Sequence, residues 1–169
     1  VLQMTFNPPG ATAQGPRIGV DNFTVQNGVA AGFTRGGGIA LASYGTAQAE
    51  LWVDNLIVRN NSGYFSGGIN LYTERGLIRV ANSLFDGNAA PSSAFGHLAT
   101  VVNHTEAVNG TGVIIANSTF VNGSCAGQDG RGCGIGLSLP TGIRADVINS
   151  LFSNNAISDV NIENGLTTG

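Results

Sequence analysis

A nine-residue pattern recurs in five copies along the chain and limits the folds that the sequence can adopt. Its clearest copy is residues 53–61, Val-Asp-Asn-Leu-Ile-Val-Arg-Asn-Asn. The pattern is an apolar residue, any residue, Asn, two residues, Val or Phe, one residue, then a pair drawn from Asn and Gly. Its third position is Asn22, Asn55, Asn82, Asn117 and Asn149. Successive copies lie about thirty residues apart, which is typical of solenoids, propellers and other repeat arrays.

The residues on both sides of each recurring asparagine predict two short strands. Leu51 and Val53 alternate with polar or exposed positions before Asn55, and Leu56 and Val58 follow it, which is typical of strands with one buried face. Asparagine tolerates the left-handed backbone that a bend between two strands needs. Stacked copies would let the amides hydrogen-bond along the stack. We therefore expect an asparagine ladder, buried at the corner. An ordinary turn residue in a β-meander is the alternative, but it does not require the constant register.

A third strand, led by glycine, recurs between the copies. Gly36-Gly37-Gly38-Ile39-Ala40-Leu41 is one example, and further copies begin at Gly67, Gly96, Gly132 and Ser158. Three short strands around one constant corner predict an all-β fold, a single-stranded parallel β-helix of five rungs plus one extra strand. We expect residues 1–169 to form one domain, uncapped at both ends. An antiparallel sandwich is the rival fold, but it would not need equal residues at equal positions.

Equivalent residues of successive rungs are expected to stack inside the solenoid. One predicted stack turns from aliphatic to aromatic along the chain: Val25, Val58, Phe85, Phe120 and Phe152. Two aliphatic stacks are predicted before the corner: Ile18, Leu51, Ile78, Val113 and Ala145, and then Val20, Val53, Val80, Ile115 and Val147. A smaller polar stack is predicted beside the corner: Ser83, Ser118 and Ser150.

Composition and charge exclude two classes of partner. The chain has 169 residues, of which 42% are hydrophobic and 10% charged, and its net charge is -3. This charge offers no basic surface for nucleic acid. The sequence contains no apolar run long enough to span a membrane and no signal peptide, so we expect no membrane insertion.

Two cysteines, Cys125 and Cys133, flank a short loop. Their spacing fits a disulfide that closes this loop, and disulfides are typical of exported proteins. The alternative is a pair of free thiols in a reducing compartment. Zinc is not expected, because no Cys/His cluster accompanies the pair.

The repeats resemble those of bacterial right-handed parallel β-helix proteins, the pectate-lyase-like superfamily. They are most similar in style to the repeats of polymorphic outer-membrane proteins and large surface proteins, which carry Gly-Gly-Ala and Phe-x-x-Asn motifs. Gly67-Gly68-Ile69 resembles the first motif without its Ala, and Phe85 with Asn88 and Phe152 with Asn155 match the second. Gly123 stands where an Asn would follow Phe120. The resemblance implies a right-handed solenoid at the bacterial cell surface or outside the cell. The superfamily includes lyases, hydrolases, adhesins and structural fibres, so the resemblance does not choose a function.

We expect no catalytic residues, no metal site and no cofactor. Enzymes of this superfamily act on polysaccharides through groups that project from the glycine-led strands, and here those outward positions are small and mostly uncharged. A glycoside hydrolase needs two facing carboxylates, and the nearest polar cluster is Asp159, Asn161 and Glu163. The alternative function is polysaccharide binding or degradation, with sugar contacts from Asn70, Tyr72 and His97.

Outward apolar residues predict a contact surface, because large apolar patches usually mark contacts. They fall before the corner (Trp52, Ile114 and Ile148) and after it (Ile57, Leu84 and Leu151). Arg79 is expected one rung from Trp52, where it can stack on the indole.

The two ends of the predicted solenoid lack a polar capping repeat, which solenoids normally carry. The apolar residues expected to take part in end-to-end pairing are Leu2, Met4 and Phe6 at one end and Val160 and Ile162 at the other. The chain is therefore expected to associate with itself, head to tail, into a fibre, or to be part of a longer surface solenoid. Cell-surface glycans are the other expected partners.

Overall fold

A computed structural model describes residues 1–6, 17–30, 36–45, 48–91, 95–103, 111–126 and 133–164. Strands make three stacked sheets, here named A, B and C, and every strand pair is parallel. Sheet A contains β1 (Leu2–Phe6), β4 (Ile39–Ser43), β7 (Ile69–Thr73), β11 (Leu98–Val102), β15 (Ile135–Leu139) and β18 (Val160–Asn164). Sheet B contains β2 (Arg17–Asp21), β5 (Ala49–Asp54), β8 (Gly76–Ala81), β12 (Thr111–Ala116) and β16 (Arg144–Ile148).

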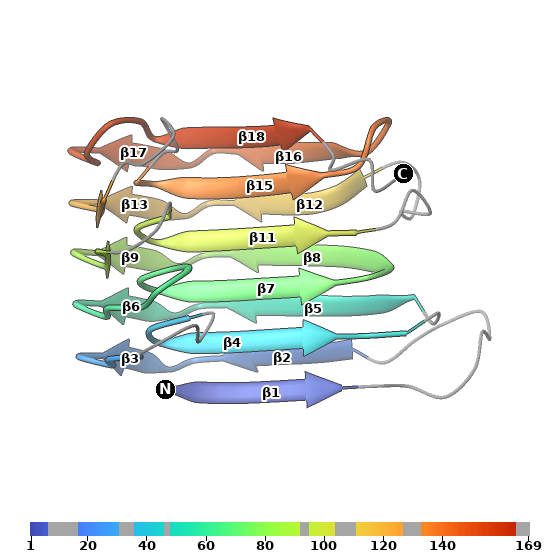
Figure 1. The fold of residues 1–169 in the computed structure, drawn as a ribbon, viewed down its shortest axis with the longest axis horizontal. Coiled ribbons are helices and arrows are strands. Elements are labelled where there is room, and N and C mark those ends of the chain that lie inside the picture. Colours follow the sequence, from blue (N-terminus) through green and yellow to red (C-terminus); the bar gives the residue numbers. More distant parts are fainter. Residues whose placement is uncertain are drawn as a thin grey trace.

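Sheet C is built from the short strands after the corner. They are β3 (Thr24–Gln26), β6 (Ile57–Arg59), β9 (Leu84–Asp86), β13 (Thr119–Val121) and β17 (Leu151–Ser153). Two further strands, β10 (Ala89–Ala90) and β14 (Ser124–Cys125), pair with each other between sheets C and A. In Figure 1 the strands of sheet A run to the right in front, those of sheet B run back behind them, and the chain climbs from β1 to β18. The molecule is therefore a right-handed parallel β-helix, as predicted.

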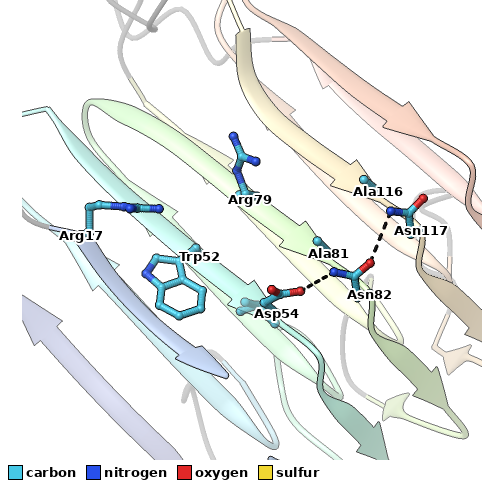
Figure 2. A pocket seen from close by; sticks show the side chains of 9 residues that line it. Arg17, Trp52, Asp54, Arg79, Ala81, Asn82, Ala116 and Asn117 are labelled. Atoms are coloured by element: carbon cyan, nitrogen blue, oxygen red, sulfur yellow. Dashed lines mark hydrogen bonds between the residues drawn. The ribbon is translucent and has the colours of Figure 1, made fainter. Parts of the chain in front are cut away.

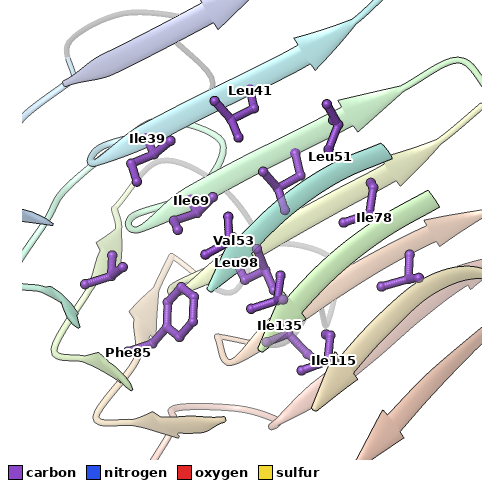
Figure 3. Packing of buried hydrophobic residues seen from close by; sticks show 14 of the residues in the cluster. Ile39, Leu41, Leu51, Val53, Ile69, Ile78, Phe85, Leu98, Ile115 and Ile135 are labelled. Carbon is purple, nitrogen blue, oxygen red and sulfur yellow. The ribbon is translucent and has the colours of Figure 1, made fainter. Parts of the chain in front are cut away.

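The strand registers confirm the predicted interior stacks. Sheet B pairs Leu51 with Ile18 and Ile78, and Val53 with Val20 and Val80. The upper rungs continue both rows in the same register. Figure 3 shows side chains of sheet B beside those of sheet A in the centre of the solenoid: Leu51, Val53, Ile78 and Ile115 from sheet B, and Ile39, Leu41, Ile69, Leu98 and Ile135 from sheet A. The core holds one column of like residues per position because parallel pairing places each inward residue directly above its equivalent.

The aromatic stack is confirmed in sheet C, where the register aligns Val25, Val58, Phe85, Phe120 and Phe152. The ring centroids of Phe85 and Phe120 lie 4.6 Å apart with planes 16° from parallel, and those of Phe120 and Phe152 lie 5.0 Å apart at 9°. These separations fall within the range of favourable aromatic pairs. The lower rungs fill the same column with valine.

The five recurring asparagines occupy one corner, and each has a left-handed backbone, with φ between 47° and 59°. The predicted ladder forms in part. Asn55 donates to Asn22, Asn117 donates to Asn82 at 3.3 Å, and Asn149 donates to Asn117 at 2.8 Å. The link between Asn55 and Asn82 is replaced, since Asn82 donates instead to Asp54 at 2.8 Å. A carboxylate is a stronger acceptor than an amide.

The prediction that this ladder is buried was wrong, because all five asparagines are exposed. The interior position beside the corner belongs to the serines. The hydroxyl of Ser83 accepts from the backbone N–H of Leu56 at 3.1 Å, and the hydroxyl of Ser118 accepts from that of Ser83 at 3.2 Å. The serine stack therefore satisfies buried backbone donors, while the asparagines supply the bend and project outward.

A second left-handed corner follows the strands of sheet C. It is formed by Asn27, Asn60, Gly87, Asn122 and Asn154, with φ between 53° and 61°. Asn154 donates to Asn122 at 2.7 Å and Asn122 donates to Asp86 at 2.8 Å. The short strands of sheet C are therefore bounded by a left-handed residue on both sides.

Candidate contact surfaces

The outward row of sheet C contains the three predicted apolar residues. Ile57, Leu84 and Leu151 are all exposed. The register continues this row through Thr24 below Ile57 and Thr119 between Leu84 and Leu151. The row is thus apolar at three of its five positions, with a threonine interruption.

The three apolar residues predicted to face outward from sheet B do not lie in one row. Trp52 pairs with Arg79, and Arg79 pairs with Ile114, so these three share a row. Ile148 pairs instead with Ala116, which lies two residues nearer the corner than Ile114. The three apolar residues therefore belong to two rows, and Arg79 separates Trp52 from Ile114.

The indole of Trp52 lies over Gly19 of the neighbouring strand. A Cβ at position 19 would overlap with the atoms of the indole ring, so only glycine permits this arrangement. Figure 2 shows the ring spread over strand β2, on the side away from Arg79. The expected stacking of Arg79 is replaced by an ion pair, because Arg79 Nε lies 3.6 Å from a Glu50 carboxylate oxygen, and Arg17 Nε lies 2.9 Å from the other oxygen.

A shallow pocket of about 700 Å³ opens on this face of sheet B. Its lining comes from four adjacent strands and the corner: Arg17, Trp52, Val53, Asp54, Arg79, Ala81, Asn82, Ala116 and Asn117. Alanines form part of the floor, and the hydrogen bonds from Asn82 to Asp54 and from Asn117 to Asn82 run along one side (Figure 2). Trp52 was predicted as a contact residue, but its pocket was not predicted.

The side chains proposed for sugar contact on sheet A are mostly not accessible to a ligand. Asn70 and His97 are buried, with exposed fractions of 1% and 0%. Phe95 covers Gly136 and packs with Phe65 in a second apolar cluster. Of the three residues proposed for sugar contact, only Tyr72 is partly exposed, and its hydroxyl accepts from Asn103 at 3.1 Å.

His97 lies in a chain of hydrogen bonds between Asn88, which is buried, and Asn155, which is partly buried. Asn88 Nδ2 lies 3.0 Å from His97 Nδ1, and His97 Nε2 lies 3.0 Å from Asn155 Oδ1. Because an amide nitrogen is a donor and an amide oxygen an acceptor, this geometry requires a neutral imidazole with its proton on Nε2. Burial lowers the pKa of His97 to about 4, although the hydrogen bond with Asn155 opposes this shift.

An exchange of residues between two strands explains why a histidine is found there. In lower rungs, Asn61 and Asn88 point inward, and the residues that face them are Gly38 and Gly68. In the next rung the asparagine position is Gly123. A Cβ there would lie 2.7 Å from His97 Nε2 and 2.5 Å from the carbonyl oxygen of Cys133. The imidazole therefore occupies the space of the missing asparagine side chain and continues the internal amide ladder.

Of the polar groups considered for catalysis, the structure describes the side chains of Asp159 and Asn161. Asp159 accepts from Asn155 at 2.8 Å. The side chain of Glu163 lies outside the described part, as does that of Phe6. Within the described residues, no group of three or more His, Cys, Asp or Glu side chains is arranged to hold a metal ion.

The end rungs leave core positions open to solvent. Leu2 and Met4 continue the rows of Ile39 and Leu41, yet they are 44% and 40% exposed. At the other end, Val160 is 37% and Ile162 is 56% exposed. The same positions in the middle rungs are fully buried.

The predicted disulfide is confirmed between Cys125 and Cys133, with Cα atoms 5.2 Å apart. Cys133 is fully buried. The disulfide suggests a non-reducing compartment. Among the described residues, no helix has the length and apolar character needed to cross a membrane.

Comparisons of the chain with models of protein families, with curated proteins and with solved structures found no match.

Proposed function

We propose that the protein is a non-catalytic structural and adhesive β-solenoid of the cell exterior, whose end rungs pair with further rungs, either those of another copy in a fibre or those of a longer surface solenoid. The observation that carries this proposal is the exposure of core rows at both end rungs. Each exposed leucine, methionine, valine or isoleucine continues a row that is dry elsewhere. Burying such side chains against another rung is favourable by about 1.5–3 kcal/mol for each fully buried residue.

The two end strands of sheet A are equivalent in register. Leu2 pairs with Ile39 on β4, and Val160 pairs with Ile135 on β15, within one continuous row of the sheet. Met4 and Ile162 share the next inward row in the same way. Strand β18 of one copy therefore carries inward residues of the kind that β1 supplies to β4.

The strand count suggests how two copies would join. Among the described strands, six belong to sheet A, whereas sheets B and C have five each. If two intact copies stacked, β18 of one and β1 of the next would be two successive strands of sheet A, with no strand of sheet B or C between them. An interface that continues all three sheets therefore requires one of these two strands to be displaced. Strand β1 pairs with β4 alone among the described strands, and its release would leave β2, β3 and β4 free to pair with β16, β17 and β18 of the next copy. We therefore propose that β1 exchanges with β18 of a neighbour. Such a head-to-tail contact does not close on itself and so produces a filament.

Location outside the cell is supported by the disulfide and by the resemblance of the repeats to those of bacterial surface proteins. Under this proposal the chain is a member of the pectate-lyase-like superfamily that has kept the solenoid without an active site. The exposed apolar row of sheet C would then serve lateral contacts or adhesion.

Electron microscopy and sedimentation of the purified protein test the proposal. We expect concentration-dependent filaments, and we expect Val160→Lys with Ile162→Lys to abolish them while the circular dichroism spectrum stays unchanged. Asn161→Lys is the matched control, since it places a lysine on the outward side of the same strand. A cross-link between cysteines at Gln3 and Ala40, which pair directly, should also block assembly by holding β1 in place. A monomer at every concentration would refute end-to-end stacking.

A further inference from the structure

We propose that the pocket of sheet B binds a neutral, extended oligosaccharide, with Trp52 as the stacking platform. This inference does not rest on end-to-end assembly, because the pocket lies on the side of the solenoid. It rests on three features of the pocket: an aromatic ring held flat, a balanced set of charged and amide groups, and a straight path across the strands.

The platform is set by the pairing of Trp52 with Gly19. Because glycine leaves no Cβ under the ring, the indole can lie against the backbone of β2 rather than stand away from the sheet. An aromatic ring in this position presents its broad face outward, where the apolar C–H face of a sugar ring can stack. A tryptophan that only filled core space would need no such glycine, since it would point inward.

The polar groups beside the platform suit hydroxyls better than a charged ligand. Arg17 and Arg79 share the carboxylate of Glu50, and Asp54 adds a second negative charge, so the formal charges of these four groups cancel. The arginines are donors, the carboxylate of Asp54 is an acceptor, and amides such as that of Asn82 are both. A ligand with many hydroxyl groups matches this mixture. A polyanion would meet a chain whose net charge is already -3.

The shape of the pocket selects an extended ligand. Its lining residues lie on β2, β5, β8 and β12, four consecutive strands of sheet B. Three spacings between neighbouring strands correspond to about 14 Å along the solenoid axis. Ala81 and Ala116 keep the floor low beyond the indole, and Asn82 and Asn117 border it (Figure 2). A flat chain of β-1,4-linked sugars can follow this path, whereas a coiled chain would leave it.

The experiment uses the fluorescence of Trp52, which is the only tryptophan of the chain. The full chain is titrated with cellohexaose, xylohexaose and mannohexaose, with maltohexaose as a coiled control and hexagalacturonate as an acidic one. We expect at least one of the three extended neutral sugars to change the emission of Trp52 in a saturable way, and to bind more tightly than both controls.

Three variants locate the site. Gly19→Ala should lift the indole and weaken binding by roughly tenfold, while the tryptophan itself remains. Ala81→Arg should block the floor from the solvent side, so that binding is lost even if Gly19→Ala fails to fold. Ser153→Ala, on the outward face of sheet C, should leave affinity unchanged. Calorimetry repeats the measurement without relying on fluorescence.

Three outcomes would overturn the inference. One is the absence of saturable binding by all three extended neutral sugars at millimolar concentration. Another is stronger binding of hexagalacturonate, which would assign the pocket to an anion. The third is an unchanged affinity in the folded Ala81→Arg variant, which would place the sugar elsewhere.

Discussion

Acidification should destabilise the protein through His97. The pKa of this histidine is about 4 in the folded state, against 6.5 for an unperturbed histidine in the unfolded chain. Between these values the unfolded chain binds a proton that the folded state excludes. The free energy of unfolding is therefore unaffected by His97 above pH 6.5 and falls as the pH drops from 6.5 towards 4. A difference of about 2.5 pKa units corresponds to a loss of about 3 kcal/mol, of which about 1 kcal/mol is reached near pH 5.5.

The cost has a structural cause. A protonated imidazole would carry hydrogens on both nitrogens. Its Nδ1 would then face the amide nitrogen of Asn88, at 3.0 Å, with a donor opposite a donor. Protonation would also place a charge among buried phenylalanines, since the ring centroids of Phe85 and Phe120 lie 6.3 and 6.2 Å from that of the imidazole. The chain of hydrogen bonds from Asn88 to Asn155 can be complete only when His97 is neutral.

Urea denaturation at pH 7.5, 5.5 and 4.0, followed by circular dichroism, measures this loss. The control is His97→Gln, which can accept from Asn88 and donate to Asn155 but does not titrate. The two proteins differ only at residue 97, so the difference between their two pH profiles isolates His97. We expect the wild type to lose about 3 kcal/mol more than the variant between pH 7.5 and 4.0. Equal losses would refute the assignment of a buried, neutral His97.

Three further substitutions test the interior and the corner, with stability measured by urea denaturation at pH 7.5. Phe120→Ala should cost about 3–5 kcal/mol because it opens the middle of the aromatic stack, whereas Phe23→Ala on the surface should cost under about 0.5 kcal/mol; similar costs would contradict the stack. Ser83→Ala should cost about 1–3 kcal/mol because the N–H of Leu56 loses its buried acceptor, and a neutral result would mean that water replaces the hydroxyl. Asn117→Ala should be less stable than Asn117→Gly by about 1 kcal/mol because its φ is positive; the reverse order would show that backbone strain is not the cost.

Most of the fold could be predicted from the repeat because parallel stacking copies one set of constraints into every rung. Each inward position needs a residue of similar size, so Leu51 and Ile78, or Phe85 and Phe120, reveal their pairing by likeness. The left-handed corner at Asn55 could be predicted for the same reason. The exposure of its side chain could not, because periodicity fixes where a residue lies along the chain and not which way it turns at a bend.

Predicting the buried position of His97 would have required comparing two facing positions of each rung rather than following one position through the repeats. His97 stands where the other rungs have Gly38 and Gly68, and Gly123 stands where they have Asn61 and Asn88. Each departure alone looks like a defect of the repeat. Together they compensate each other, because a large side chain replaces glycine at one position and glycine replaces a large side chain at the facing position. This paired change was the signal in the sequence that could have located His97. The platform under Trp52 depended in the same way on a neighbour in another rung, Gly19.

The backbone hydrogen bonds of all three sheets run along the solenoid axis, and β1 and β18 lie at opposite ends of the stack (Figure 1). A force that pulls these two strands apart would therefore act on the hydrogen bonds of one rung at a time, so that the rungs separate in sequence. Successive rungs contain 33, 27, 35 and 32 residues between equivalent corner positions, so each would release about 90–120 Å of extended chain. The bond between Cys125 and Cys133 would hold back part of the last of these lengths. Under load, the molecule would thus extend in steps of unequal length, and each step would be the unfolding of one rung.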